Sequence, residues 1–119
     1  MRRFALPRAK HDQGIKRYGF HGLSYCFIVG ELARRKPALA KGRVVVAQFG
    51  CGAGLCGLEG GISRDTLMSF SALDGTPMTT RCGALDPGVL LHLLAQGGYD
   101  ARRLEDQLYR RSGLLAVSG

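Results

Sequence analysis

Three glycines stand at alternate positions in the run Gly50-Cys51-Gly52-Ala53-Gly54, between two strand-like segments. Glycine lets the backbone approach an anion closely and adopt positive φ, and successive N–H groups in such a turn can form an anion-binding nest. No Gly-Lys-Ser/Thr follows the run, and the next segment is strand-like, so a P-loop and a dinucleotide fingerprint are both excluded. The glycines alone leave two interpretations, a phosphate-binding turn and a plain Gly-rich β-turn.

Two side chains elsewhere could assist phosphate chemistry. Arg81 lies in the Gly- and Pro-containing stretch Gly75–Gly83, and its planar guanidinium matches the oxygens of a phosphoryl group. His21 follows Phe20 and can donate a hydrogen bond in either protonation state. Each residue also has a structural interpretation, His21 as a satisfied core residue and Arg81 as a surface residue. The carboxylate of Asp65 is interpreted as a strand-end turn residue rather than a catalytic group.

The elements around the glycine run form a predicted three-stranded antiparallel meander, because the connections are too short for a helical crossover. The β-branched run before the glycines predicts a buried strand, and Gly60-Gly61 predicts a hairpin turn. The expected strands are Val44–Ala47, Leu55–Glu59 and Ile62–Thr66. With helices on either side, the fold class is α/β.

Periodic apolar residues and capping signals predict three helices. Ser24 is a candidate N-cap for the first, which Pro37 ends, while Asp86-Pro87 begins the second and Gly97-Gly98 ends it. The third has Leu104, Leu108 and Tyr109 on one side. The predicted helices are Leu23–Lys36, the segment from Asp86 to Gly97, and Asp100–Arg111; Leu67–Gly83 is expected to be irregular, and Met1–Gln13 and Ser112–Gly119 to be tails.

The composition narrows the class of protein. The net charge is +8, from 17 Lys and Arg against 9 Asp and Glu, and we expect most of the basic residues on solvated helix faces. No RNA-binding aromatic motif or Cys/His finger focuses this charge, so no nucleic-acid partner is expected. No apolar run is long enough to cross a bilayer, and Pro7 interrupts the stretch after the basic start, which predicts a cytoplasmic protein without a signal peptide. We expect the four cysteines to be reduced; they are Cys26, Cys51, Cys56 and Cys82.

Several motifs in the same order resemble those of one family, the acetate kinases. The resemblance rests on RYGFHGLS at Arg17–Ser24, VVVAQFGCGAG at Val44–Gly54, SRDTLMSF at Ser63–Phe70, LDGTPMTTRCG at Leu73–Gly83, DPG at Asp86–Gly88 and SGLL at Ser112–Leu115. It extends from about Phe4 to the last residue. Any one motif would be weak, but their agreement in register is specific.

This resemblance implies a partial actin-like, ribonuclease-H-like phosphotransferase domain and reversible phosphoryl transfer between ATP and acetate or propionate, with Mg²⁺. His21 and Arg81 match the residues that stabilise the transition state. The loop that binds ATP phosphates corresponds to Gln48, Phe49, Gly50, Cys51 and Gly52. The resemblance places no metal ligand in this chain.

The chain also differs from the family pattern. Gln48, Cys51, Gly54, Leu67, Ser69 and Thr79 replace the usual residues, the last two standing at glycine positions. Such replacements are costly wherever the backbone needs positive φ. We expect residues 1–119 to be an internal fragment of one domain, divided into 1–42, 43–66 and 67–119.

The expected function is therefore that of an acetate-kinase-like phosphotransferase that is incomplete and inactive alone. Two alternatives are open at this point. One is a non-catalytic module that binds phosphate or nucleotide, and the other is a module that completes its fold with a partner chain. A homodimer, as the family forms, is also considered.

Overall fold

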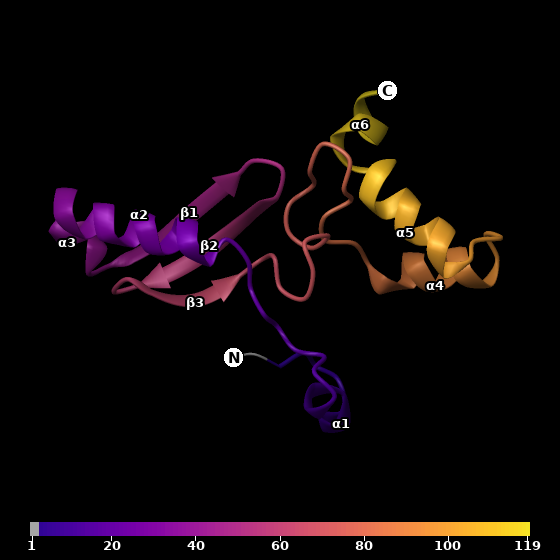
Figure 1. Cartoon of the computed structure of the whole chain (residues 1–119), viewed down its shortest axis with the longest axis horizontal. Helices are drawn as coiled ribbons and strands as arrows, with labels where there is room; N and C mark the ends of the chain where they lie inside the picture. Colours follow the sequence, from indigo (N-terminus) through magenta and orange to yellow (C-terminus); the bar gives the residue numbers. More distant parts are fainter. Residues whose placement is uncertain (1–2) are drawn as a thin grey trace.

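The computed structural model describes residues 3–119, so Met1 and Arg2 of the basic start lie outside the described residues. Six helices and three strands follow one another along this part of the chain (Figure 1). The elements are α1 (Arg8–Asp12), α2 (Gly22–Arg35), α3 (Pro37–Ala40), β1 (Arg43–Phe49), β2 (Ala53–Glu59), β3 (Ile62–Thr66), α4 (Pro87–Ala95), α5 (Ala101–Arg110) and α6 (Gly113–Ser118).

The predicted meander is confirmed. The three strands form one antiparallel sheet in the order β1-β2-β3, with Val46 opposite Cys56 in the first pair. Gly60 and Gly61, which join β2 to β3, have φ of 58° and 77°. Two positive φ values in a two-residue loop define the turn type that matches the twist of a hairpin.

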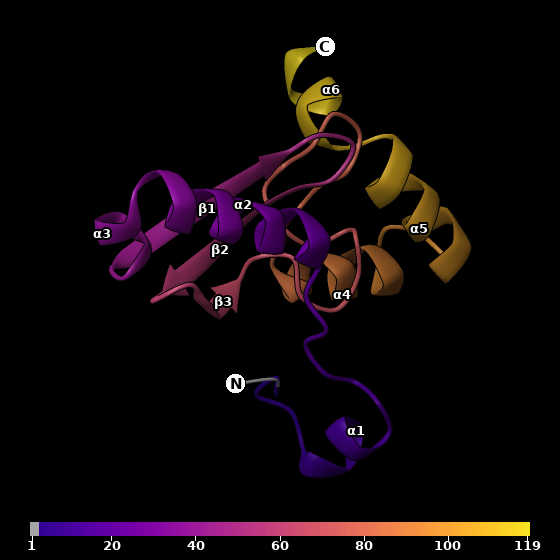
Figure 2. The ribbon, with the colours of Figure 1, turned by 60° about the vertical axis from the view of Figure 1, so that its left-hand side comes forward.

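One face of the sheet is covered and the other is open. Tyr25 and Val29 of α2 pack on Cys56 and Leu58 of β2, and Figures 1 and 2 show α2 lying along the sheet. On the opposite face of β1, Val45 is 69% exposed. The prediction of a buried first strand is therefore wrong: Val44 and Val46 are only half-buried against α2, and Val45 and Ala47 are exposed because no described element packs on their side.

A second core forms in the segment after β3. Ala53, Met68 and Met78 are buried together, with Phe20 and Ala72 packed against them. This segment contains no helix or strand until α4, as expected from Gly75, Pro77 and Gly83. Side chains from the segment after β3, from the start of β2 and from Phe20 thus form a small core that is distinct from the one under α2.

The helix ends follow the predicted caps only in part. Asp86 caps α4 by accepting a hydrogen bond from the Gly88 N–H at 2.8 Å, and Asp100 caps α5 in the same way. The N-cap of α2, however, is His21 rather than Ser24, which lies inside the helix. The two expected tails also contain short helices, α1 and α6.

The chain is spread out for its length. Its radius of gyration is 16.9 Å, whereas a compact domain of this length has about 13.5 Å. Its accessible area is 8522 Å², against about 6,300 Å² for a folded monomer of this mass. Helices α4 to α6 lie to one side of the sheet in Figure 1, and many large apolar side chains are exposed.

Candidate functional site

His21 has a strained backbone and an unsatisfied side chain. Its φ of 61° and ψ of 22° make it the one non-glycine residue with positive φ among residues 3–119. Its Nε2 atom is buried and has no hydrogen-bond partner within the same residues. The ring meets Tyr25 edge to face at 6.2 Å. Left-handed backbone and orphaned polar atoms both cost free energy, and they concentrate at functional sites.

The glycine loop packs directly on this histidine. A Cβ atom placed on Gly52 would lie 3.1 Å from both Nε2 and Cε1 of His21, so a side chain there would crowd the ring and the loop or the ring would have to shift slightly. The Gly50 N–H donates to the Gly52 carbonyl at 3.1 Å and closes the turn. Gly50, Gly52 and Gly54 all lack positive φ. The turn therefore differs from the left-handed nest that their spacing suggested, and close approach is the property that favours glycine here.

The other loop residues divide between inward and outward positions. Gln48 is half-buried, and its Oε1 accepts a hydrogen bond of 2.5 Å from the Ser24 hydroxyl. Phe49 is 70% exposed, and Cys51 is exposed as well. Of the predicted phosphate loop, the structure therefore brings Gln48 and Gly52 to α2 and its N-cap and turns Phe49 toward solvent. Ser24 is a contact that the sequence indicated only as a cap.

Arg81 lies in a separate environment. Its Nη1 donates to the Ala72 carbonyl at 3.0 Å, and its guanidinium carbon lies 5.9 Å from the centroid of the Tyr109 ring. It lines an open cleft of about 840 Å³ whose other walls come largely from α5. Neither His21 nor the glycine loop lines that cleft. No hydrogen bond joins the two predicted catalytic residues within residues 3–119, although Arg81 Nη1 lies 3.9 Å from the sulfur of Met78, which packs in one core with Met68.

Met68 connects the two environments, a role that no pattern in the sequence indicates. Its side chain is 1% exposed. A Cβ on Gly52 would lie 3.4 Å from the Met68 methyl carbon, and one on Gly75 would lie 3.6 Å from it. The glycine loop and the start of the Arg81 segment therefore share one buried side chain.

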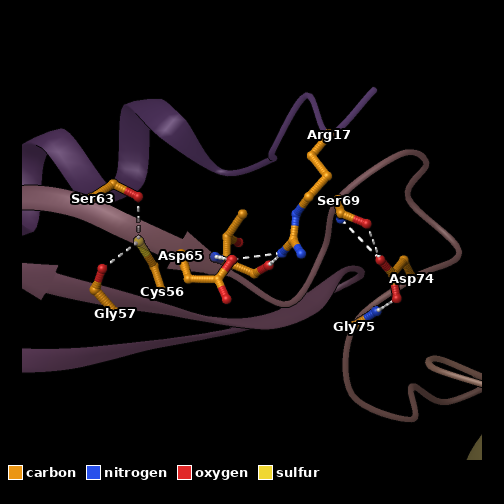
Figure 3. Close-up of polar contacts among 9 residues, drawn as sticks. Arg17, Cys56, Gly57, Ser63, Asp65, Ser69, Asp74 and Gly75 are labelled. Atoms are coloured by element: carbon orange, nitrogen blue, oxygen red, sulfur yellow. Dashed lines mark hydrogen bonds and ion pairs between the residues drawn. The ribbon is translucent and has the colours of Figure 1, made fainter. Parts of the chain in front are cut away.

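Asp74 organises the segment between Met68 and Arg81 (Figure 3). One carboxylate oxygen accepts from the backbone N–H and the hydroxyl of Ser69, and the other accepts from the Gly75 N–H at 2.9 Å. Ser69 is buried and has no positive φ, and Thr79 has none either. The two residues that replace family glycines therefore cause no left-handed strain.

Arg17 fastens the N-terminal segment to the end of β3. Its Nη2 donates to Asp65 Oδ1 and to the Thr66 carbonyl, both at 2.6 Å (Figure 3). This contact confirms a structural role for Asp65, whose carboxylate also accepts from the Thr66 N–H. The Tyr18 and Gly19 N–H groups both donate to the Ser69 carbonyl, which fixes the chain as it enters His21.

Burial shifts the pKa of two groups near these residues. It raises the pKa of the Tyr25 hydroxyl, with a smaller contribution from Cys56. Burial also raises the pKa of the Cys82 thiol, and the Asp74 carboxylate adds to this effect. Both groups therefore stay protonated and neutral at neutral pH. All four cysteines lie within residues 3–119 and are free thiols.

Within residues 3–119, no cluster of three His, Cys, Asp or Glu side chains could hold a metal ion. The resemblance implies Mg²⁺, but these residues provide no such cluster for it, so the ion would need ligands from bound phosphates, water or other residues. In the same part of the chain, no helix has the length and apolarity needed to cross a membrane.

Comparisons with known proteins agree with this arrangement of elements and loops. The model of the acetokinase family matches residues 2–119, so the chain belongs to the acetokinase family. It is 56% identical over 117 residues to the acetate kinase of Rhodopseudomonas palustris and 53% identical over 116 residues to that of Methylocella silvestris. Each alignment covers 98% of this chain and 29% of the relative.

Solved structures give the same result for the fold. The Porphyromonas gingivalis acetate kinase superimposes with a TM-score of 0.88 at 32% identity, covering 99% of this chain and 30% of that protein. The Entamoeba histolytica acetate kinase gives 0.87 at 35% identity, and a Francisella tularensis propionate kinase gives 0.86 at 31%. The α/β fold is confirmed, and this chain spans less than a third of the length of the proteins it matches.

Proposed function

We propose that this chain supplies part of an acetate-kinase-type site for phosphoryl transfer between ATP and acetate or propionate. His21 and the loop from Gln48 to Gly52 face the phosphoryl group, and Arg81 supplies a second, separately held donor. The observation that carries the proposal is the buried, unpartnered Nε2 of His21 beside Gly52. An orphaned donor or acceptor is costly unless a ligand completes it.

The residues have a clear chemical task in that reaction. Negative charge spreads over the phosphoryl oxygens in the transition state, and donors fixed in advance stabilise it. His21 offers Nε2, and the Cys51 and Gly52 N–H groups make no hydrogen bond within residues 3–119. Bound ATP would supply the transferred phosphoryl group, and no step is assigned to Mg²⁺, since no group of three His, Cys, Asp or Glu within residues 3–119 could hold it.

Phosphate titration followed by NMR tests the binding part of the proposal. Adding inorganic phosphate or ATP should move the Cys51 and Gly52 amides and the His21 ring resonances. Gly50, whose N–H already closes the turn, should move less. The Gly57 amide, in the middle of β2, serves as an internal reference. Unchanged Cys51, Gly52 and His21 resonances at saturating ATP would contradict the proposal.

We further propose that the chain does not turn over by itself. It offers few donors and no metal cluster within residues 3–119, whereas phosphoryl transfer needs both donors and metal close together. Purified chain mixed with ATP, Mg²⁺ and acetate should form no acetyl phosphate, measured as the hydroxamate. Turnover that an Arg81→Leu substitution abolishes would overturn this part.

A complementing module is the second candidate, and one observation favours it. The accessible area of 8522 Å² exceeds that of a compact monomer by roughly 2,200 Å². On one chain, that excess is larger than the roughly 800 Å² per partner of a standard interface and is in the range of obligate complexes. We expect a polypeptide that carries the remaining part of an acetokinase to bind this chain. Co-purification and recovery of acetyl phosphate synthesis would support the idea, and a chain that stays monomeric and inactive in the mixture would contradict it.

A further inference from the structure

The segment from the end of α5 into α6 holds the loop that carries Arg81. It approaches Met78–Cys82 across roughly 30 residues of sequence and bonds to it at nearly every position. Four backbone bonds and one side-chain bond join them: Leu114 N–H to Met78 O at 2.8 Å, Leu115 N–H to Thr79 O at 2.9 Å, Ser112 N–H to Thr80 O at 3.0 Å, Cys82 N–H to Leu108 O at 3.1 Å, and Thr80 Oγ1 to Tyr109 O at 2.9 Å.

Gly113 allows this close approach. Its φ is 68°, and a Cβ atom there would lie 2.1 Å from the Met78 carbonyl oxygen and 2.7 Å from that of Arg81. Backbone atoms cannot move aside as the end of a side chain can. Any other residue at position 113 would therefore push the Arg81 backbone away from α6.

Tyr109 positions the Arg81 side chain, as Gly113 positions the Arg81 backbone. The Arg81 guanidinium lies over the Tyr109 ring at 5.9 Å, while its Nη1 is fixed on the Ala72 carbonyl. A guanidinium is attracted to the face of an aromatic ring at this separation. The ring and the carbonyl together restrict the direction in which the remaining N–H groups point.

Core packing does not explain the segment that contains Gly113. Helix α6 has no buried residue, and Val117 is 87% exposed. Leu114 and Leu115 are more than half exposed as well. The contacts that this segment does make are the hydrogen bonds to the Arg81 loop, so holding that loop is the role that its geometry supports.

We propose that Gly113 and Tyr109 are positioning residues for Arg81, setting its backbone and its guanidinium for phosphoryl transfer. This inference rests on the proposed function, in which Arg81 donates to the phosphoryl group. It assigns a role to the Ser112–Leu115 motif, which has no hydrogen bond to the glycine loop within residues 3–119. Orientation matters because a donor aimed in advance needs no reorganisation during the reaction.

A pair of glycine substitutions tests the backbone part. Gly113→Ala adds a methyl group against two carbonyls, whereas Gly98→Ala adds one at nearly the same φ, 65°, with no atom within 4 Å. The readout is the Arg81 Nε–H resonance and the amides of Thr79 to Cys82. We expect Gly113→Ala to shift them and Gly98→Ala to leave them in place. Equal shifts in the two variants, or none in Gly113→Ala, would overturn the inference.

A second pair tests the side-chain part. Tyr109→Phe keeps the aromatic face and should keep the Arg81 Nε–H resonance near its original position. Tyr109→Leu removes the face and should move it. An Nε–H resonance that responds equally to both substitutions would contradict a role for the ring.

The response to phosphate distinguishes a misplaced Arg81 from a chain that has lost its fold. Because a misplacement of 1 Å can cost about 100-fold, we expect Gly113→Ala to weaken the phosphate response of Arg81 roughly tenfold or more, with the Gly52 response unchanged. A wild-type chain in which neither Arg81 nor Gly52 responds to phosphate would count against the proposed function. The ligand-free Arg81 shift would still decide the positioning inference.

Discussion

His21 and Arg81 are held in place by two different kinds of structure. His21 caps α2 and meets the glycine loop through side-chain contacts, with a strained backbone and an unpartnered Nε2. Arg81 has ordinary φ and a satisfied guanidinium nitrogen, and hydrogen bonds from the α5–α6 junction fix its loop. Free energy is stored at the first residue and not at the second.

The difference shows where this part of the chain can tolerate change. Removing a strained, unsatisfied group is expected to raise the free energy of unfolding, because the strain serves the site and not the fold. A loop held by backbone bonds depends instead on residues remote in sequence. Substitutions in the two regions should therefore change the free energy of unfolding with different signs as well as different sizes.

The largest effect is expected from Met68→Ala, which removes the side chain shared by both regions. Loss of a buried methionine should lower the free energy of unfolding by about 2–5 kcal/mol, measured by urea denaturation. The Gly52 and Gly75 amides should both shift. Leu58→Ala, in the core under α2, should cost a similar amount and leave the Gly75 amide in place. A Met68→Ala variant that moves only one of the two amides would show that the regions are independent.

A smaller effect of opposite sign is expected from His21→Gly. It removes left-handed strain of about 1–2 kcal/mol and an orphaned nitrogen, and it loses some ring packing. We expect a net gain of about 1 kcal/mol in stability, since an orphaned buried group alone costs about 1–3 kcal/mol. His92→Gly, inside the regular helix α4, should instead lose about 0.5–1 kcal/mol. Similar losses in both variants would contradict stored strain at His21.

Each region also contains a cysteine that reports on it. Cys51 is exposed in the glycine loop, whereas burial raises the pKa of the Cys82 thiol next to Arg81. Iodoacetamide reacts with the thiolate, so mass spectrometry at neutral pH should find Cys51 alkylated several times faster. The two rates should converge in urea. Equal rates in the native chain would place the Arg81 loop in solvent.

The smallest effect concerns the end of α5. Hydrogen bonds from Arg111 and Arg110 lower the pKa of Asp106. A lowered pKa in the folded state means that the contribution to stability is present above the ordinary Asp pKa of about 3.9. It is lost as the pH falls through the lower folded value. The urea midpoint should therefore fall more between pH 5 and pH 2 in the wild type than in Asp106→Asn, and parallel profiles would exclude a contribution from this pair.

The sequence predicted what depends on nearby residues. The meander follows from β-branched runs and the Gly60-Gly61 turn, and the cap of α4 follows from Asp86. His21, Arg81 and the loop were selected through the family resemblance rather than from residue types. Their roles in phosphoryl transfer stay predictions that the proposed experiments address.

Contacts between segments that lie far apart in the chain could not be predicted from the sequence. The left-handed φ of His21 depends on how α2 meets the glycine loop. The hydrogen bond from Ser24 to Gln48 joins residues that lie 24 positions apart in the sequence. Helix α6 was missed because its apolar residues stay exposed and show no amphipathic pattern. For Met68, an apolar residue in an irregular segment, no periodicity marks burial.

The uncovered side of β1 has a consequence for handling the chain in solution. The edge strand begins with Arg43, which pairs with Glu59, but Val44 to Ala47 carry no charge and the next residues are Gln48 and Phe49. The opposite edge, β3, carries Arg64 and Asp65, both in ion pairs. Uncharged, β-branched edges recruit further strands from other molecules, and a lysine at the exposed position blocks this growth. The chain should therefore form β-rich aggregates as its concentration rises, and Val45→Lys should delay their appearance in light scattering.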